Sequence, residues 1–272
     1  MFFNFYGKYL KDIKIDFLPT GFTSFNDKLI FISPRGKGRR SRSDYCTISV
    51  ISENGEIQGR LINRNNEKEI DKKEKIGLGA IIYQVYILNN TLHYWEAFYD
   101  TIWNISSDFK VTSKNSIYYG KDKLPFKYIL ESNAKKLTIE TLKKYVIPQY
   151  FYETNRYMFF ELGNKGKMNH IYYDKFSGKS FNLEFKEEVG NRINFSFYND
   201  IDGGLPFWPD GVISEDKVFS VIYGYDLKKY YDEHRNKSAK LITPQNDKIL
   251  KLINQTKLTD NPIIMIVTLK NK

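Results

Sequence analysis

The 272-residue sequence has little of the chemistry that marks disulfide frameworks, zinc sites and membrane spans. Cys46 is its only cysteine, so an intramolecular disulfide is excluded. Its three histidines, His93, His170 and His234, are scattered rather than grouped with Cys as zinc ligands would be. No stretch reaches the ~18 consecutive apolar residues of a transmembrane helix. We therefore predict no metal site of this kind and no transmembrane segment, and interpret each histidine as a surface residue.

The sequence also lacks recognisable signals for export and for nucleophilic catalysis. Its first residues, 1–6, contain no basic segment, no long apolar run and no cleavage site, so no signal peptide is predicted in this chain. No Ser-His-Asp order and no nucleophile elbow is present. The sequence thus contains no recognisable export signal, and the lack of a nucleophile motif favours a non-enzymatic protein.

Positive charge is in excess, with a formal net charge of +10 from 42 Lys and Arg against 32 Asp and Glu. The densest basic segment, residues 34–43, reads PRGKGRRSRS and holds Arg35, Arg39, Arg40 and Arg42. Such a segment can neutralise phosphates. It has no interleaved aromatic residues, however, and no nucleic-acid-binding fold is recognisable around it. We interpret it as a basic surface loop and keep polyanion binding as an alternative.

Aromatic residues are abundant, with 21 Tyr and 20 Phe, and they favour strands because they pack well on a half-buried pleated surface. Short apolar or alternating runs bounded by turn residues predict strands throughout the chain. The predicted strands are 28–32, 45–51, 81–88, 92–98, 157–162, 168–173, 180–185, 218–223 and 263–269. This density of short strands predicts an all-β fold.

A strand–turn–strand unit recurs along the chain, with turns at Gly7, Gly55, Asp108 and Gly178. The first two intervals are about 50 residues and the third about 70, against ~40–50 for the four-stranded blade of a β-propeller. Glycine suits the tight turn because it adopts positive φ without strain. The repeat therefore predicts blades of four antiparallel strands, with insertions that lengthen the later ones.

Three helical patterns interrupt the strands. They are predicted at residues 137–146, ending before Pro148, at 227–234 with Asp226 as the N-cap, and at 248–255 with Asn246 or Asp247 as the N-cap. We interpret all three as short insertions between blade strands, covering a rim or one face of the sheets. Since no convincing linker is present, residues 1–272 are predicted to form a single domain.

The segment 199–209, NDIDGGLPFWP, resembles the hallmark of a largely uncharacterised family of six-bladed, NHL-like β-propeller proteins of Bacteroidetes. Segments 98–105, 153–160 and 260–267 resemble further parts of that family. The resemblance implies a six-bladed propeller and a cell-envelope, lipoprotein-like or exported protein. Family members open with an export signal and one or two further blades, so it also implies an N-terminally truncated, incomplete propeller here.

The candidate binding residues are those expected on loops at the propeller's central funnel: Arg156, Asp200, Asp202 and Trp208. Arg156 would offer a bidentate donor to a carboxylate or a sugar. Trp208 would either stack on a sugar ring or pack between blades, and packing is favoured. Asn199, Asp200 and Asp202 could supply oxygen ligands for calcium, but turn-forming hydrogen bonds are the favoured interpretation.

The sequence thus predicts a non-enzymatic binding or scaffold module of the bacterial cell envelope, with a glycan or protein ligand at the funnel and no cofactor. The first alternative is a glycan hydrolase or lyase, for which Glu96 with Asp100, or Asp200 with Asp202, would be the paired carboxylates. The second alternative is polyanion binding through Arg35–Arg42. Nucleic acid is the less favoured partner.

Overall fold

The computed structural model describes residues 2–3, 6–15, 19–32, 46–63, 83–97, 99–125, 128, 138–164, 166–183, 196–199, 201, 205–234 and 246–270. By their contacts these residues form two compact units. The first comprises Met1–Ile147 with Asn164–Gly166, and the second comprises Pro148–Gly163 with Lys167–Lys272. The single domain expected over residues 1–272 stays a prediction.

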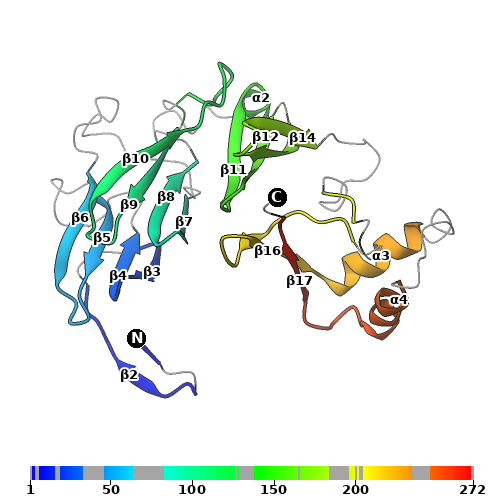
Figure 1. The fold of residues 1–272 in the computed structure, drawn as a ribbon, viewed down its shortest axis with the longest axis horizontal. Helices are drawn as coiled ribbons and strands as arrows, with labels where there is room; N and C mark the ends of the chain where they lie inside the picture. The colour runs from blue at the N-terminus through cyan, green and yellow to red at the C-terminus, as the bar shows by residue number, and fades with distance from the viewer. Residues whose placement is uncertain are drawn as a thin grey trace. The chain divides into compact units, whose positions relative to one another are not determined.

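The first unit is built from antiparallel sheets (Figure 1). One four-stranded sheet contains β3 (Gly21–Phe25), β4 (Lys28–Ile32), β5 (Cys46–Ile51) and β6 (Ile57–Asn63) in that order. A second contains β7 (Tyr83–Leu88), β8 (Thr91–Glu96), β9 (Thr101–Ile105) and β10 (Val111–Ser116). A two-stranded ribbon of β1 (Phe2–Phe3) and β2 (Tyr9–Lys11) and the short helix α2 (Ile139–Leu142) complete the described elements of this unit.

The two four-stranded sheets of the first unit share one core. Ile30, Ile48 and Val50 of one sheet and Tyr94 and Ile105 of the other are buried in the same cluster. Each of these residues alternates along its strand with a residue on the opposite face, as a pleated strand requires. Burial of alternate apolar side chains against a neighbouring sheet is therefore what stabilises this unit.

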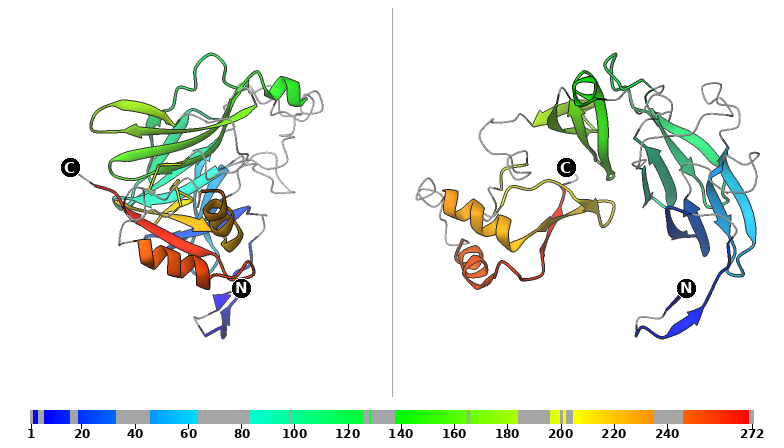
Figure 2. Two further views of the ribbon diagram at one scale, coloured as in Figure 1. Left: turned by 90° about the vertical axis from the view of Figure 1, so that its right-hand side faces the viewer. Right: turned by 180° about the vertical axis from the view of Figure 1, so that it is seen from behind.

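The second unit holds a four-stranded antiparallel sheet, a three-stranded one and two helices. The first sheet contains β11 (Val146–Glu153), β12 (Tyr157–Asn164), β13 (Lys167–Asp174) and β14 (Lys179–Leu183). The second contains β15 (Gly211–Val212), β16 (Lys217–Ile222) and β17 (Ile263–Thr268). Helices α3 (Gly224–His234) and α4 (Asn246–Gln255) lie between β16 and β17 in the sequence and side by side in space (Figures 1 and 2).

The recurring turns of the sequence have a structural meaning. Each turn joins the last two strands of a sheet: Gly55 lies between β5 and β6, Gly178 between β13 and β14, and Gly7 between β1 and β2. All three glycines have positive φ, of 90°, 67° and 77° respectively. In the turn between β9 and β10, which has no glycine, Phe109 takes the positive φ of 58°. The predicted repeat of four-stranded antiparallel sheets is confirmed, while closure into a propeller stays a prediction.

The helix predictions are corrected in three places. Residues 137–146 were expected to form one helix, but only Ile139–Leu142 are assigned to α2, and Val146 already belongs to β11. Pro148 lies inside β11, which is tolerated because β11 is an edge strand that needs no ladder donor on one side. Helix α3 begins at Gly224, so Asp226 lies in its first turn instead of capping it. Helix α4 begins at Asn246, so Asn246 and Asp247 also lie inside the helix instead of capping a helix that starts at residue 248.

Candidate functional site

Arg156, the first candidate binding residue, lies in the turn between β11 and β12, and its guanidinium is bound by other groups of the second unit. Arg156 donates from Nε to Oδ1 of Asp174 at 3.2 Å and from Nη2 to Oδ2 at 3.1 Å. Its Nη1 donates to the carbonyl oxygen of Lys270 at 3.1 Å, and the rings of Tyr157 and Phe176 lie 5.0 and 5.3 Å from its central carbon. The bidentate donor predicted for a ligand carboxylate therefore binds a carboxylate of the protein itself.

The neighbouring residues of the same turn are also held by polar contacts. Glu153, 1% exposed, accepts a hydrogen bond at 2.7 Å from the ammonium of Lys175. Lys175 also donates to the carbonyl oxygen of Thr154, whose hydroxyl accepts from the backbone N–H of Tyr157 at 3.0 Å. The first half of the segment 153–160, which the family resemblance singled out, thus fastens the β11–β12 turn to the β13–β14 turn. Its role in the structure is architectural.

The pH dependence of stability tests this fastening. The guanidinium of Arg156 lowers the pKa of Asp174 below its usual value of 3.8. A carboxylate whose pKa is lower in the folded chain contributes stability that is complete above its unfolded pKa and is lost as the pH falls through the folded value. We expect Asp174→Asn to lower the melting temperature at neutral pH, and the difference from wild type to shrink below about pH 4.

The control for this prediction is Asp122→Asn, which changes an exposed aspartate of the first unit. It should leave the melting temperature within error of wild type across the same pH range. A wild-type minus Asp174→Asn difference that stays constant from neutral to acidic pH would show that the Arg156 pair is not the cause.

The second candidate, Trp208, is a core residue. It is 3% exposed, its ring stacks on His170 at 4.2 Å between centroids, and it meets Phe159 edge-on at 5.6 Å. Phe197 packs against another part of it at 5.7 Å. Packing, the favoured interpretation, is confirmed, and no ligand could stack on Trp208 while these rings are in place. Its Nε1 has no hydrogen-bond partner in the described part of the chain.

The prediction that the histidines are surface residues is wrong for His93 and His170, which are 3% and 1% exposed. His93 stacks on Tyr86 at 4.8 Å. His170 lies between the Trp208 ring and the buried Glu161, whose Oε1 is 3.6 Å from its Nε2. Burial was missed because the strand pattern around each histidine does not reveal which residues cover it. The side chain of His234 lies outside the described residues.

The predicted calcium loop is described only in part. Asn199 acts as a turn residue: its Oδ1 accepts from the N–H of Ile201 at 3.2 Å and its amide donates to the carbonyl oxygen of Leu205 at 3.4 Å. Asp200 and Asp202 lie outside the described residues, as do Arg35, Arg39, Arg40 and Arg42. In the described part, no three His, Cys, Asp or Glu side chains are grouped to hold a metal ion.

The carboxylates proposed for glycan cleavage that the structure describes have separate partners. Glu96 is 1% exposed and accepts from the hydroxyl of Tyr94 at 2.9 Å. Asp100 is paired with the ammonium of Lys123. Glu96 and Asp100 are thus each bound within the first unit and do not form an open pair.

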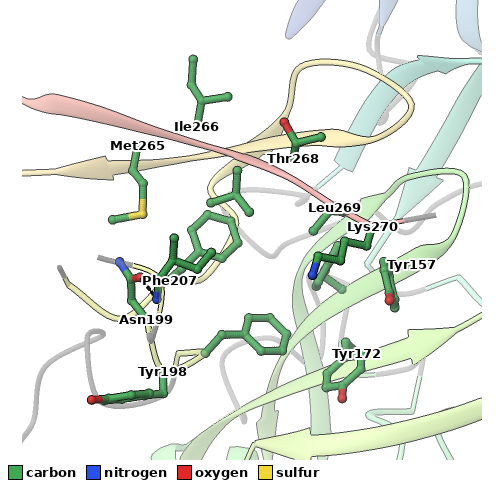
Figure 3. A pocket seen from close by; sticks show the side chains of 14 residues that line it. Tyr157, Tyr172, Tyr198, Asn199, Phe207, Met265, Ile266, Thr268, Leu269 and Lys270 are labelled. Carbon is green, nitrogen blue, oxygen red and sulfur yellow. Dashed lines mark hydrogen bonds between the residues drawn. The ribbon is translucent and has the colours of Figure 1, made fainter. Parts of the chain in front are cut away.

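The second unit contains an aromatic pocket of about 500 Å³, which no single sequence motif indicated (Figure 3). Its volume is within the ~300–1,000 Å³ typical of small-molecule sites. Residues of β12 and β13, the segment 197–199, Ile201, Phe207, and residues of β17 and its end contribute to it. The lining residues are Tyr157, Phe159, Tyr172, Phe197, Tyr198, Asn199, Ile201, Phe207, Met265, Ile266, Val267, Thr268, Leu269 and Lys270.

The aromatic wall of this pocket is rigidly supported. Tyr172 stacks on Phe181 at 4.8 Å and packs against Phe197 at 5.2 Å, and Phe197 in turn contacts Trp208. Burial raises the pKa of Tyr172, so its hydroxyl stays neutral and able to donate a hydrogen bond. Tyr198, which also lines the pocket, differs from the wall because it is 60% exposed. The pocket therefore offers fixed ring faces and one accessible ring.

The polar groups of the pocket are few. They are the tyrosine hydroxyls, the Asn199 amide, the Thr268 hydroxyl and the Lys270 ammonium. None of the fourteen lining residues is Asp, Glu, His or Cys. An apolar surface with a small number of placed polar groups is the usual composition of a binding pocket. Such a surface suits contact with rings or apolar side chains, and it favours anionic over cationic groups near Lys270.

A family model described as "Domain of unknown function (DUF4934)" matches residues 1–268, so the chain belongs to that family. The chain is also similar to a solved structure from Bacteroides fragilis titled "Putative exported protein". The TM-score is 0.63 at 16% sequence identity, and the match covers 97% of this chain and 69% of that chain. At this identity the likeness shows a shared fold alone. No curated protein matches the chain.

The fold class and the absence of a membrane-spanning helix among the described residues can be stated at a coarse level. The fold is mostly β, with repeated four-stranded antiparallel sheets and few helices. In the described part of the chain, no helix has the length and apolar character needed to cross a membrane. The predicted partner, whether glycan or protein, stays a prediction.

Proposed function

We propose that this DUF4934 chain is a non-enzymatic binding module whose ligand is held in the aromatic pocket of its second unit. The observation that carries the proposal is the pocket itself, with about 500 Å³ of space lined by six aromatic rings. An exposed ring such as Tyr198, which is 60% exposed, still has apolar surface in water, so a ligand that covers its face lowers the free energy. The ligand is therefore a glycan or a polypeptide that presents ring faces or apolar groups.

The composition of the lining supports binding in preference to catalysis. General acid–base or nucleophilic chemistry needs carboxylate, imidazole, thiol or activated hydroxyl groups within hydrogen-bond reach of the substrate. The described lining offers tyrosines, one threonine, one amide and one ammonium, and it contains no carboxylate, imidazole or thiol. Rings that are fixed by their neighbours lose little conformational entropy when a ligand arrives, which favours affinity.

The site replaces the funnel proposed from the sequence. Arg156 and Trp208 are both occupied by contacts within the second unit, with Asp174 and with His170 respectively. The residues that take over their roles are Tyr198, as the accessible ring, and Lys270, as the cation. The polyanion alternative rests on Arg35–Arg42, which lie outside the described residues, so no described feature favours it.

The setting that we propose is a β-propeller of four-stranded blades, six in complete form, in the bacterial cell envelope. The support for blades is the repeat of four-stranded antiparallel sheets, each closed by an equivalent last turn. The support for the envelope is the similarity in fold to the Bacteroides fragilis structure titled as an exported protein. Fractionation of a producing cell, followed by detection of the chain in the envelope or the cytosol, tests the location.

Tyr198→Ala tests the pocket. Because truncation of an aromatic contact residue in a binding site can cost ~2 kcal/mol, we expect the Kd of a ligand found by thermal-shift screening to rise more than tenfold. The screen uses neutral oligosaccharides, acidic oligosaccharides and blocked peptides. The fold should be retained, since Tyr198 is 60% exposed.

The matched control is Tyr225→Ala, which removes a tyrosine of similar exposure, 57%, from α3 of the same unit but not from the pocket. It should leave the Kd unchanged. Equal binding by wild type and Tyr198→Ala would place the ligand elsewhere and contradict the proposal.

A further inference from the structure

Strand β17 is an open sheet edge. It pairs with β16 on one side, from Ile263 opposite Ile222 to Thr268 opposite Lys217, and in the described part of the chain no strand pairs with its other side. Among the described residues, the other sheets of more than two strands have four, whereas this sheet has three. The strand IIMIVT contains no charge and no proline, the two devices that usually protect an edge from pairing.

The direction of the backbone groups of β17 follows from one hydrogen bond. The N–H of Leu269 donates to the carbonyl oxygen of Asp216 at 2.8 Å, so odd-numbered residues direct their backbone groups toward β16. Ile264, Ile266 and Thr268 consequently direct their N–H and C=O groups outward. These outward N–H and C=O groups recur every ~6.8 Å along the edge, and the backbone groups of an extended polypeptide have the same spacing.

The pocket adjoins this edge. Six consecutive residues, 265–270, line it from β17 and its end. Met265 points toward Asn199 and Phe207, whereas Ile266 points to the opposite side of β17 (Figure 3). A strand added at the edge would place alternate side chains on the same face as Met265, next to the pocket. Its remaining side chains would cover Ile264 and Ile266, which are 51% and 59% exposed.

The charge of the pocket bears on the residue type expected at one end of such a strand. Lys270, at the C-terminal end of β17, is the single charged residue in the lining. β17 itself pairs with β16 in the antiparallel sense, as do the strands of the two four-stranded sheets of the first unit. An antiparallel strand on β17 would have its N-terminal end beside Lys270. An acidic residue there would be attracted to the ammonium.

We propose that the ligand of the pocket is an extended polypeptide that adds an antiparallel fourth strand to β17, inserts alternate apolar side chains into the aromatic pocket and places an acidic residue near Lys270. This inference rests on the proposed function and specifies its ligand. Recognition of this kind takes affinity from main-chain hydrogen bonds and specificity from pockets for alternate side chains. A glycan could fill the pocket but would leave the backbone groups of Ile264, Ile266 and Thr268 unmatched.

Isothermal titration with a blocked peptide of about eight residues tests the proposal, since that length spans the edge. The peptide carries glutamate first and then alternating valine and threonine. We expect Ile266→Pro to weaken its binding at least tenfold, because proline removes the outward N–H of residue 266 and leaves the bonds to β16 in place. The matched control Ile266→Thr keeps the N–H and should bind within threefold of wild type.

A peptide N-methylated on the edge that faces β17 repeats the test on the unchanged protein, so the proposal stays testable if Ile266→Pro does not fold. It should bind at least tenfold more weakly, and a peptide with lysine in place of the glutamate should also lose affinity. Undiminished binding of the N-methylated peptide would overturn the proposal. So would a concentration-dependent dimer that Ile266→Pro abolishes, because a second copy would then be the occupant of the edge.

The failure of this inference can be told apart from that of the proposed function. If no peptide binds but an oligosaccharide raises the melting temperature of wild type and not of Tyr198→Ala, the extended strand is excluded and the pocket stands. If neither class of ligand has a Tyr198-dependent effect, both proposals fail.

Discussion

Replacing Trp208 with alanine is expected to lower the free energy of unfolding by ~3–5 kcal/mol, the usual cost of removing a large buried aromatic side chain. Trp208 is 3% exposed and joins the rings of Phe159, Phe197 and His170 at centroid distances between 4.2 and 5.7 Å. Its loss would open a cavity that these rings cannot close without leaving their neighbours. Urea or guanidinium denaturation of the purified chain measures the change.

Trp208→Phe is the control for this prediction. Phenylalanine keeps most of the aromatic contact and removes the indole N–H, which has no hydrogen-bond partner among the described residues. We expect it to cost clearly less than alanine, because an unpaired buried donor is itself unfavourable. A Trp208→Ala chain as stable as wild type would contradict the core assignment and restore Trp208 as a candidate for ligand stacking.

Lys175→Met should also be strongly destabilising, by ~3–5 kcal/mol, because it leaves a buried carboxylate without its cationic partner. Glu153 is 1% exposed, and the ammonium of Lys175 reaches both its Oε1 and the carbonyl oxygen of Thr154. Methionine keeps most of the apolar stem of lysine, so the change tests charge more than volume. Denaturant unfolding gives the cost.

The double variant Glu153→Gln with Lys175→Met separates a lost attraction from an uncompensated charge. Since it removes the carboxylate charge as well, we expect it to recover part of the stability that Lys175→Met alone loses. If the double variant loses more unfolding free energy than the two single variants lose together, Glu153 is stabilised by other contacts and Lys175 is not its main partner.

The features predicted well from sequence were those determined locally. Asn89 and Asn90 form the two-residue turn that joins the strands predicted at 81–88 and 92–98, with φ of 51° and 54°, because asparagine tolerates this conformation at little cost. The hairpin at Asn26 and Asp27, with φ of 51° and 60°, follows the same rule but was missed, and strand β3 with it. The signal was present there as a polar pair between apolar runs.

The features that sequence could not give depend on distant segments. Arg156 was expected to offer a bidentate contact to a ligand, but Asp174, on another hairpin, accepts that contact. The buried state of His170 depends on Trp208, which is far from it in sequence. The pocket combines side chains from four segments, so neither Tyr198 nor Lys270 was singled out. Pairing decides which residues meet, and periodicity within one strand does not reveal the pairing.

The most direct test of the account is an NMR titration of the isotope-labelled chain with the oligosaccharide and peptide pools, reading the backbone amide shifts. The account predicts that the largest shifts fall on pocket and edge residues, among them Tyr198, Asn199 and Ile266, and that residues of the first unit such as Asn89 stay unchanged. Shifts concentrated in the first unit or in Arg35–Arg42, or no shifts with either pool, would contradict a ligand site in this pocket.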